Sequence, residues 1–184
     1  MTIAPIDRSI SKVGPDNGAS ARLSEQRALP RYVLLGEPGI GKSTAFAQEA
    51  AAAGTVPVRA ADFVEGTRPA GPTLFIDALE EYRIGEDGID RLRSLVQALA
   101  ESGYAGWRIA CRAISLKPPD ARLLTEKLGA YATLQLELLD RFEQRALLAA
   151  RDEADPSGFI ERMHGLGAGA LLGNPATLLL LKDT

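Results

Sequence analysis

The sequence contains little of what marks several large classes of protein. One cysteine, Cys111, among 184 residues excludes an internal disulfide framework and a cysteine-based zinc site, and it favours a reducing, cytoplasmic setting. The net charge is −3 and there is no run of Lys or Arg, so nothing indicates a nucleic-acid footprint. The longest aliphatic run, residues 178–181, is far too short to span a membrane, and the N-terminus lacks a signal-peptide core. We therefore expect no direct binding to nucleic acid or to a membrane.

One loop of the chain fits the pattern G-x-x-x-x-G-K-[ST], the phosphate-binding loop of P-loop NTPases. The loop consists of Gly36, Glu37, Pro38, Gly39, Ile40, Gly41, Lys42 and Ser43. Residues 31–35 read as a strand and residues 43–53 as a helix, which is the context that this motif requires. The glycines allow positive φ angles, so backbone N–H groups can surround the β- and γ-phosphates at the positive end of the helix. Lys42 adds a full charge, and the Ser43 hydroxyl is expected to ligate Mg²⁺.

A second signal is an apolar strand that ends in an acid. Residues 73–77 form this strand, and Asp77 stands at its carboxyl end, ahead of Ala78, Leu79, Glu80 and Glu81. A parallel strand of this kind delivers its carboxylate to the sheet edge where the phosphate loop lies. Asp77 is expected to hold Mg²⁺ through a water. Either Glu80 or Glu81 is expected to polarise the attacking water, and the sequence leaves the choice open, although Glu81→Gln is the substitution we first expect to slow hydrolysis.

A third strand places an arginine at the same edge. Residues 107–111 read as a strand, and Arg112 follows it, where an arginine lies near a bound γ-phosphate in this kind of fold. Cys111 reads as a small buried hydrophobic residue rather than a reactive thiol.

The organisation expected along the chain is an α/β fold, a P-loop NTPase of the ASCE type with a parallel sheet flanked by helices. Hydrophobic residues make up 46% and charged residues 24%, which suits one domain with a real core. Residues 1–30 read as a polar, weakly ordered lead-in with a short helix near residues 19–27, and residues 31–139 as the NTPase core. Residues 132–138 alternate and predict a last strand at a sheet edge. Residues 140–184 read as an incomplete helical subdomain, and its Leu-rich final helix fits either a piece of a longer chain or a docked terminal helix.

Together, these motifs resemble the STAND class of signal-transduction NTPases, particularly its NACHT branch. The stretch from Leu35 to Thr44 resembles the P-loop of that branch. The Walker B motif of that branch has a small residue after its Asp and an acidic pair two positions further on. The stretch from Asp77 to Glu81 follows this spacing, with Glu80 where Asp is more usual. Arg112 matches the sensor-1 arginine of the family. The segment Gly173-Asn174-Pro175 matches its Gly-x-Pro motif, and the resemblance implies that Pro175 packs near the nucleotide base.

The resemblance implies a regulated switch that uses ATP, ADP and Mg²⁺. Members of the family sit in larger proteins with an effector domain, a winged helix and a repeat-built sensor, and ATP exchange with self-association turns them on. Many bacterial members act in antiphage defence or signalling. This chain carries the NTPase motifs without the winged helix or the sensor, so we expect nucleotide binding with slow hydrolysis. His164 stands alone and is expected on a helix surface.

Other functional classes fit less well. An AAA+-like ATPase motor would require an arginine finger from a neighbouring subunit, for which Arg83 and Arg122 are the only candidates. A nucleotide-binding interaction module without turnover also stays open. A P-loop GTPase would carry a guanine-reading Asn-Lys-x-Asp or Thr-Lys-x-Asp stretch after a strand, and none is present. A P-loop kinase would carry an acceptor site and an Arg-rich lid, and we identify neither.

Overall fold

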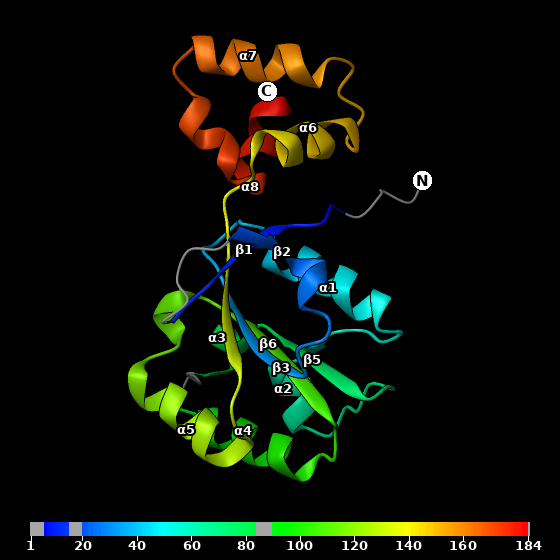
Figure 1. Cartoon of the computed structure of the whole chain (residues 1–184), viewed down its shortest axis with the longest axis vertical. Helices are drawn as coiled ribbons and strands as arrows, with labels where there is room; N and C mark the ends of the chain where they lie inside the picture. The colour runs from blue at the N-terminus through cyan, green and yellow to red at the C-terminus, as the bar shows by residue number, and fades with distance from the viewer. Residues whose placement is uncertain (1–5, 15–19, 84–89, 184) are drawn as a thin grey trace.

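The computed structural model describes residues 6–14, 20–83 and 90–183, which form a sheet flanked by helices and a small helical unit at one end (Figure 1). The strands are β1 Ser9–Lys12, β2 Ser20–Arg22, β3 Arg31–Leu35, β4 Val58–Arg59, β5 Thr73–Asp77, β6 Gly106–Cys111 and β7 Ala132–Leu136. The α-helices of the sheet domain are α1 Lys42–Ala52, α2 Ala60–Val64, α3 Leu79–Arg83, α4 Leu92–Glu101 and α5 Pro118–Leu128. The helical unit contains α6 Arg141–Ala149, α7 Pro156–Gly165 and α8 Pro175–Lys182.

The strand order across the sheet is β2-β1-β7-β3-β6-β5-β4. The five strands from β7 to β4 are parallel, whereas β1 is antiparallel to both of its neighbours. β3 carries the glycine loop at its carboxyl end, β5 carries Asp77, and β6 lies between them. This confirms the expected fold class, an α/β P-loop NTPase fold of the ASCE type.

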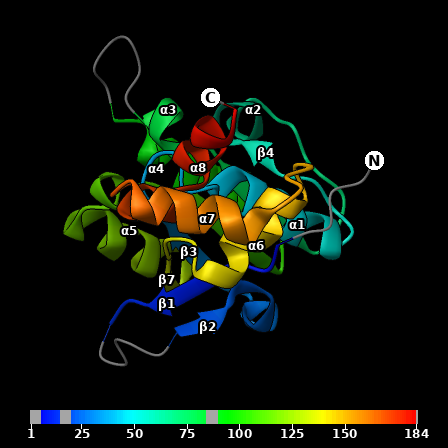
Figure 2. The same ribbon diagram turned by 90° about the horizontal axis from the view of Figure 1, so that it is seen from above.

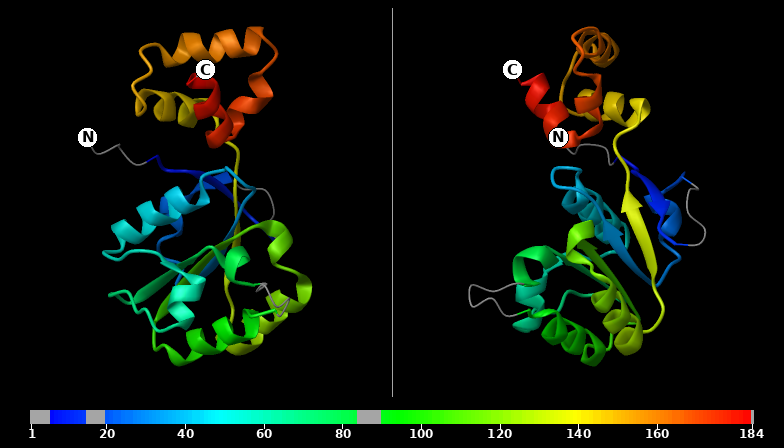
Figure 3. Two further views of the ribbon diagram at one scale, coloured as in Figure 1. Left: turned by 180° about the vertical axis from the view of Figure 1, so that it is seen from behind. Right: turned by 90° about the vertical axis from the view of Figure 1, so that its left-hand side faces the viewer.

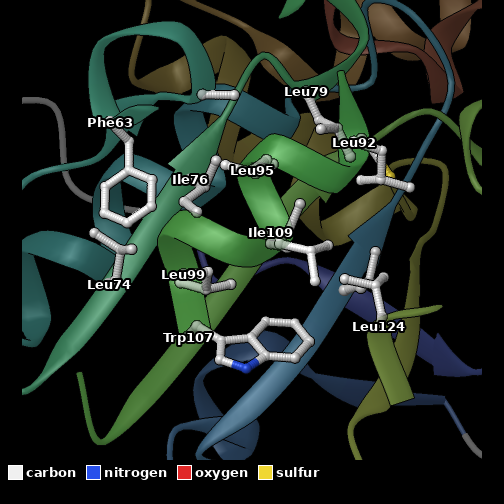
Figure 4. Packing of buried hydrophobic residues seen from close by; sticks show 14 of the residues in the cluster. Phe63, Leu74, Ile76, Leu79, Leu92, Leu95, Leu99, Trp107, Ile109 and Leu124 are labelled. Carbon is white, nitrogen blue, oxygen red and sulfur yellow. The ribbon is translucent and has the colours of Figure 1, made fainter. Parts of the chain in front are cut away.

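Residues of β3 alternate between the two faces of the sheet and so tie both layers of helices to it. Val33 and Leu35 belong to the core formed with α2, α4 and α5, and Figure 4 shows the side chains of that core packed together. Tyr32 and Leu34 belong to the core on the opposite face, where Phe46 of α1 meets Phe75 edge to face at 5.2 Å. A central strand buried on both faces is a rigid base for the loop that follows it.

The lead-in, residues 1–30, differs from the weakly ordered segment that the sequence suggested. Residues 1–5 and 15–19 lie outside the described residues, but β1 and β2 form a hairpin, and a 3₁₀ turn, Leu23–Gln26, stands where a helix was expected. Ile10 and Leu23 are buried in the core beneath α1. Short strands with only one or two apolar side chains carry almost no periodic signal, which is why this hairpin was missed.

The strand expected over residues 132–138 is present as β7, but the prediction that it lies at a sheet edge is wrong. β7 lies inside the sheet because β1 pairs with it, Ile10 opposite Leu136 and Lys12 opposite Leu134. The alternation that suggested an exposed face is real, since Leu134 and Leu136 are buried while the residues between and around them are half-buried. The alternation therefore does not indicate a missing neighbouring strand.

The helical unit is placed beyond the carboxyl ends of the strands, as the two views of Figure 3 show. Side-chain caps begin its three helices: Asp140 accepts from the Glu143 amide, Asp155 from the Gly158 amide, and Asn174 from the amides of residues 176 and 177. Its small core contains six buried side chains: Leu139, Leu148, Phe159, Ile160, Leu172 and Leu178. Across the described part of the chain, no helix combines the length and apolarity needed to cross a bilayer.

Candidate nucleotide-binding site

The glycine loop has the backbone shape that an anion cradle needs. Gly39 and Gly41 have φ angles of 76° and 89°, in the left-handed region that glycine tolerates best. A Cβ on Gly36 would stand 2.9 Å from Cγ2 of Ile40, so a larger residue there would push the loop apart. The Gly36 amide is held by the carbonyl of Cys111 at 3.2 Å, which fixes the start of the loop to β6. The loop then leads directly into α1, whose first amides have no partner within the helix.

The charged and hydroxyl side chains of the loop lie where it passes into α1. They belong to Lys42, Ser43 and Thr44. Lys42 Nζ donates to the carbonyls of Gly36 at 2.8 Å and Glu37 at 3.1 Å, so the ammonium folds back over the loop. Ser43 and Thr44, in the first turn of α1, are exposed. The contacts of Lys42 in this structure are with backbone oxygens, and its role toward a phosphate stays a prediction.

Asp77 lies at the same edge of the sheet as the loop. Ile76, Ile109 and Val33 stand at one level on β5, β6 and β3, so Asp77 is level with Leu34 two strands away. At the usual strand spacing of about 4.8 Å, the two Cα atoms are roughly 10 Å apart. Asp77 thus lies two strands from β3, whose carboxyl end leads into the loop that carries Ser43.

A strained residue turns the chain sharply after Asp77. Ala78 has φ of 57°, which is uncommon for a residue with a Cβ, and its amide donates to Asp77 Oδ1 at 2.8 Å. The turn sends the chain straight into α3, so the first turn of that helix carries Glu80 and Glu81 beside the carboxyl ends of the strands.

The two glutamates face different surroundings. Glu80 is 21% exposed, and its Oε1 lies 3.4 Å from Nε of Arg112. Glu81 is 62% exposed and pairs with Arg59 at the end of the edge strand β4. The structure therefore brings Glu80 and Arg112 together near the loop and turns Glu81 away from it.

The buried thiol of Cys111 lies close enough to Glu80 and Lys42 to interact with their charges. Burial raises the pKa of Cys111 to about 12, the charge of Glu80 adds to the rise, and the charge of Lys42 opposes it. Cys111 is thus a buried, protonated thiol, as the sequence suggested. Glu80 and Lys42 both lie within electrostatic reach of the strand end that supports the loop.

The helical unit contacts the loop through the segment that matched the Gly-x-Pro motif. Asn174 Nδ2 donates to the carbonyl of Pro38 at 3.1 Å, and the Ala176 amide donates to the carbonyl of Gly39 at 3.3 Å. Pro175 lies between these contacts, and a Cβ on Gly41 would come within 3.6 Å of its ring. Asn174 therefore caps α8 and holds the phosphate loop at the same time.

Arg8 is a site residue that sequence reasoning missed. Its guanidinium is buried and donates to the carbonyl of Ile40 in the loop at 2.7 Å and to that of Glu137 at 2.7 Å. Burial lowers the pKa of Arg8, and the charges of Glu143 and then Asp140 oppose that effect. Arg8 stands in a segment with no motif and no periodicity, so the sequence carried no signal for it.

A buried carboxylate joins the lead-in hairpin to the helical unit. Glu143 is 0% exposed, and its Oε1 accepts from the Ser9 amide at 2.6 Å and from Arg22 Nη1 at 2.9 Å. Its Oε2 accepts from the Asp140 amide at 2.9 Å, and Arg8 Nε lies 3.8 Å from Oε1. The lead-in, the loop and the helical unit thus meet at one cluster.

A cavity of about 100 Å³ opens between these three parts. Its walls come from the lead-in, the loop and α1, the start of the helical unit, and α8: Ile6, Arg8, Gly41, Thr44, Ala45, Gln48, Leu139, Leu147, Arg151, Pro175 and Leu179. Figure 2 shows the helical unit lying over α1 and the sheet edge when the molecule is viewed from above.

No protein-family model and no curated protein matches the chain. Among solved structures it is similar to a DNA replication initiation factor, with a TM-score of 0.49 and 13% identity over 87% of this chain and 56% of that one. It is also similar to the replication initiator DnaA bound to AMPPCP and single-stranded DNA, with a TM-score of 0.46, 14% identity and the same coverages. The chain thus spans just over half the length of both.

Proposed function

We propose that this chain is an ATP-binding, slowly hydrolysing NTPase module of the STAND/NACHT-like kind. Residues 31–139 would form the NTPase core and residues 140–184 the helical subdomain. The observation that carries the proposal is the pair of hydrogen bonds from Asn174 and Ala176 to the loop carbonyls of Pro38 and Gly39. Through them, a change in the loop on nucleotide binding reaches the helical unit directly.

The residues at the phosphate end suit ATP or ADP with Mg²⁺. The loop amides between Gly39 and Thr44 and the ammonium of Lys42 would hold the phosphates. Oxygen ligands from one hydroxyl and one carboxylate, Ser43 and Asp77, suit Mg²⁺, which in such sites completes its shell with phosphates and waters. When bound, the ion neutralises charge on the transferred phosphoryl group.

The base end of the site is the cavity beside Pro175, where the nucleobase is expected to bind. This cavity is too small for a nucleobase in the present structure. Pro175 and Arg8 line a cavity of about 100 Å³, whereas small-molecule sites usually measure about 300–1,000 Å³. A purine would therefore enter only if the helical unit shifts away from the loop. That shift is the conformational step of the proposed switch, and in a full-length protein it would govern self-association. A role in bacterial signalling or antiphage defence, in the cytoplasm, follows from the family resemblance.

The motor alternative has less support. An arginine finger must reach a neighbouring subunit, but Arg83 is 9% exposed and pairs with Asp120 at 2.7 Å and Asp90 at 3.0 Å. Arg122 is exposed on α5 and stays the only candidate of the two. A binding module without turnover is the remaining alternative, and it differs from the proposal only in the rate of phosphate release.

Calorimetric titration with Mg²⁺ and ATP, ADP or GTP tests the proposed function, together with a phosphate-release assay. We expect binding of ATP and ADP, weaker binding of GTP, and slow release of phosphate from ATP. Binding without any phosphate release would support the interaction module. No heat and no competition with any of the three nucleotides would reject the site.

A further inference from the structure

Two neighbouring glutamates at the start of α3 are each paired with an arginine from a different strand end. Glu80 Oε1 lies 3.4 Å from Nε of Arg112, which follows the central strand β6. Glu81 pairs with Arg59, at the end of the edge strand β4. The side chains of the outer pair are 62% and 63% exposed, whereas Glu80 is 21% exposed. The chemistry of the pairs is the same, but only the inner pair lies beside the phosphate loop.

The inner pair is incomplete in a way that points to a ligand. The second carboxylate oxygen of Glu80, Oε2, is buried and has no hydrogen-bond partner among the described residues. A buried acceptor without a donor is unfavourable, and in native structures it often marks a place where a water or a ligand belongs. Arg112, by contrast, is 48% exposed, so its guanidinium is open to a second partner.

We propose that Arg112 and Glu80 form an internal lock on hydrolysis, and that a γ-phosphate opens it by taking over the guanidinium. This inference rests on the proposed function. A terminal phosphate carries more negative charge than one carboxylate and matches the guanidinium fork, so it competes well for Arg112. ADP offers no γ-phosphate, and the lock stays closed.

Opening the lock leaves the Glu80 carboxylate free to accept a proton. The oxygen of a water forms a bond to the γ-phosphorus while the bond from that phosphorus to the β–γ bridging oxygen breaks. ADP departs with the bridging oxygen and its electron pair, and the proton of the water passes to Glu80. Arg112 keeps its charge throughout and acts on the leaving and transferred oxygens by position.

A double-mutant cycle on binding affinity tests the lock without depending on turnover. The ligands are Mg²⁺ with an ATP analogue that has a methylene β–γ bridge, and Mg²⁺ with ADP. In wild type the analogue must displace Glu80 from Arg112, so Glu80→Gln should bind it roughly twofold to fivefold tighter, the range of a partly exposed ion pair. The affinity for ADP should not change. In the Arg112→Ala background the gain from Glu80→Gln should vanish, because no guanidinium is left to release.

The outcomes separate the lock from the binding site and from general charge effects. No gain in Glu80→Gln, or an equal gain in the Arg112→Ala background, overturns the lock. Failure of wild type to bind either nucleotide rejects the proposed function, and the lock with it. Arg59→Ala breaks the outer pair and is the matched control, which should leave both affinities unchanged. Arg112→Lys, with thermal melts of every variant, provides a second cycle if Arg112→Ala does not fold.

Discussion

The two ends of the candidate site are built in different ways. The phosphate end is made of short segments at the carboxyl ends of parallel strands. Each candidate residue there is positioned by a strand end: Lys42 by β3, Asp77 and Glu80 by β5, and Arg112 by β6. The base end is made of segments far apart in the chain, since Arg8 in the lead-in, Leu139 before α6 and Pro175 in α8 line one cavity.

This difference assigns different tasks to the two ends. The phosphate end stands on a sheet buried on both faces, so we expect it to keep its shape when a ligand binds. The base end depends on a small helical unit that reaches the loop through a few hydrogen bonds, two of them from Asn174 and Ala176. We expect that unit to move when a nucleotide binds.

Lys42→Ala should have the largest effect. The phosphates would lose a full compensating charge, and charge-assisted hydrogen bonds contribute about 1.5–3 kcal/mol each. We expect ATP binding to fall by about 100-fold or more, below detection in a calorimeter, while a thermal melt still shows a cooperatively folded protein. Unchanged affinity would show that the loop does not hold the phosphates.

Glu80→Gln should come next. A general base contributes about 100-fold or more to a rate, so phosphate release should fall by that factor while Mg²⁺-ATP stays bound. Glu81→Gln, its neighbour on α3, should change the rate less than about threefold, because the exposed Glu81 pairs with Arg59 instead. The reverse ranking in a phosphate-release assay would return the role to Glu81, the residue that the sequence first favoured.

Arg8→Met tests the base end. The substitution keeps the apolar stem but removes the hydrogen bonds to the carbonyls of Ile40 and Glu137. We expect the affinities for ATP and ADP to fall by the same factor, about tenfold, since lost hydrogen bonds of a charged donor are worth about 1.5–3 kcal/mol. Arg145→Met, on the exposed side of α6, is the control. A loss confined to ATP would place Arg8 at the phosphate end.

Asp140→Ala should have the smallest effect and a defined dependence on pH. The carboxylate caps α6, and its loss should lower the free energy of unfolding by about 1 kcal/mol near pH 7. Burial tends to raise the pKa of Asp140, but the Glu143 amide, Arg22 and the Phe142 amide outweigh it and lower the pKa overall. The contribution of the charged group is therefore full above the ordinary pKa of about 3.9 and is lost as pH falls through the lowered value. Thermal melts of wild type and variant should converge in that acidic range, and a constant difference would contradict this.

Sequence patterns predicted the phosphate end because its chemistry is local. A glycine loop between a strand and a helix, or an acid at the end of an apolar strand, can be read from consecutive residues. The choice between Glu80 and Glu81 could not be read this way. It depends on the positive φ of Ala78 and on which strand end, Arg59 or Arg112, each side chain reaches.

The base end escaped prediction because distant pairings create it. Arg8 becomes a site residue only because β1 pairs with β7 and carries it under the loop. Glu143 looked like one half of a capping box, and it is, but its burial against Ser9 and Arg22 depends on the same hairpin. Pro175 was predicted as a site residue only through the family resemblance, since helix-start residues by themselves indicate no ligand.

The most direct measurement is a crystal structure of the chain with Mg²⁺ and a non-hydrolysable ATP analogue. We predict phosphate oxygens within hydrogen-bond distance of the amides of residues 39–43, the ion between Ser43 and Asp77, and the helical unit shifted from its present contacts with Pro38 and Gly39. Phosphates bound elsewhere on the sheet, or an ion coordinated away from Asp77, would contradict it.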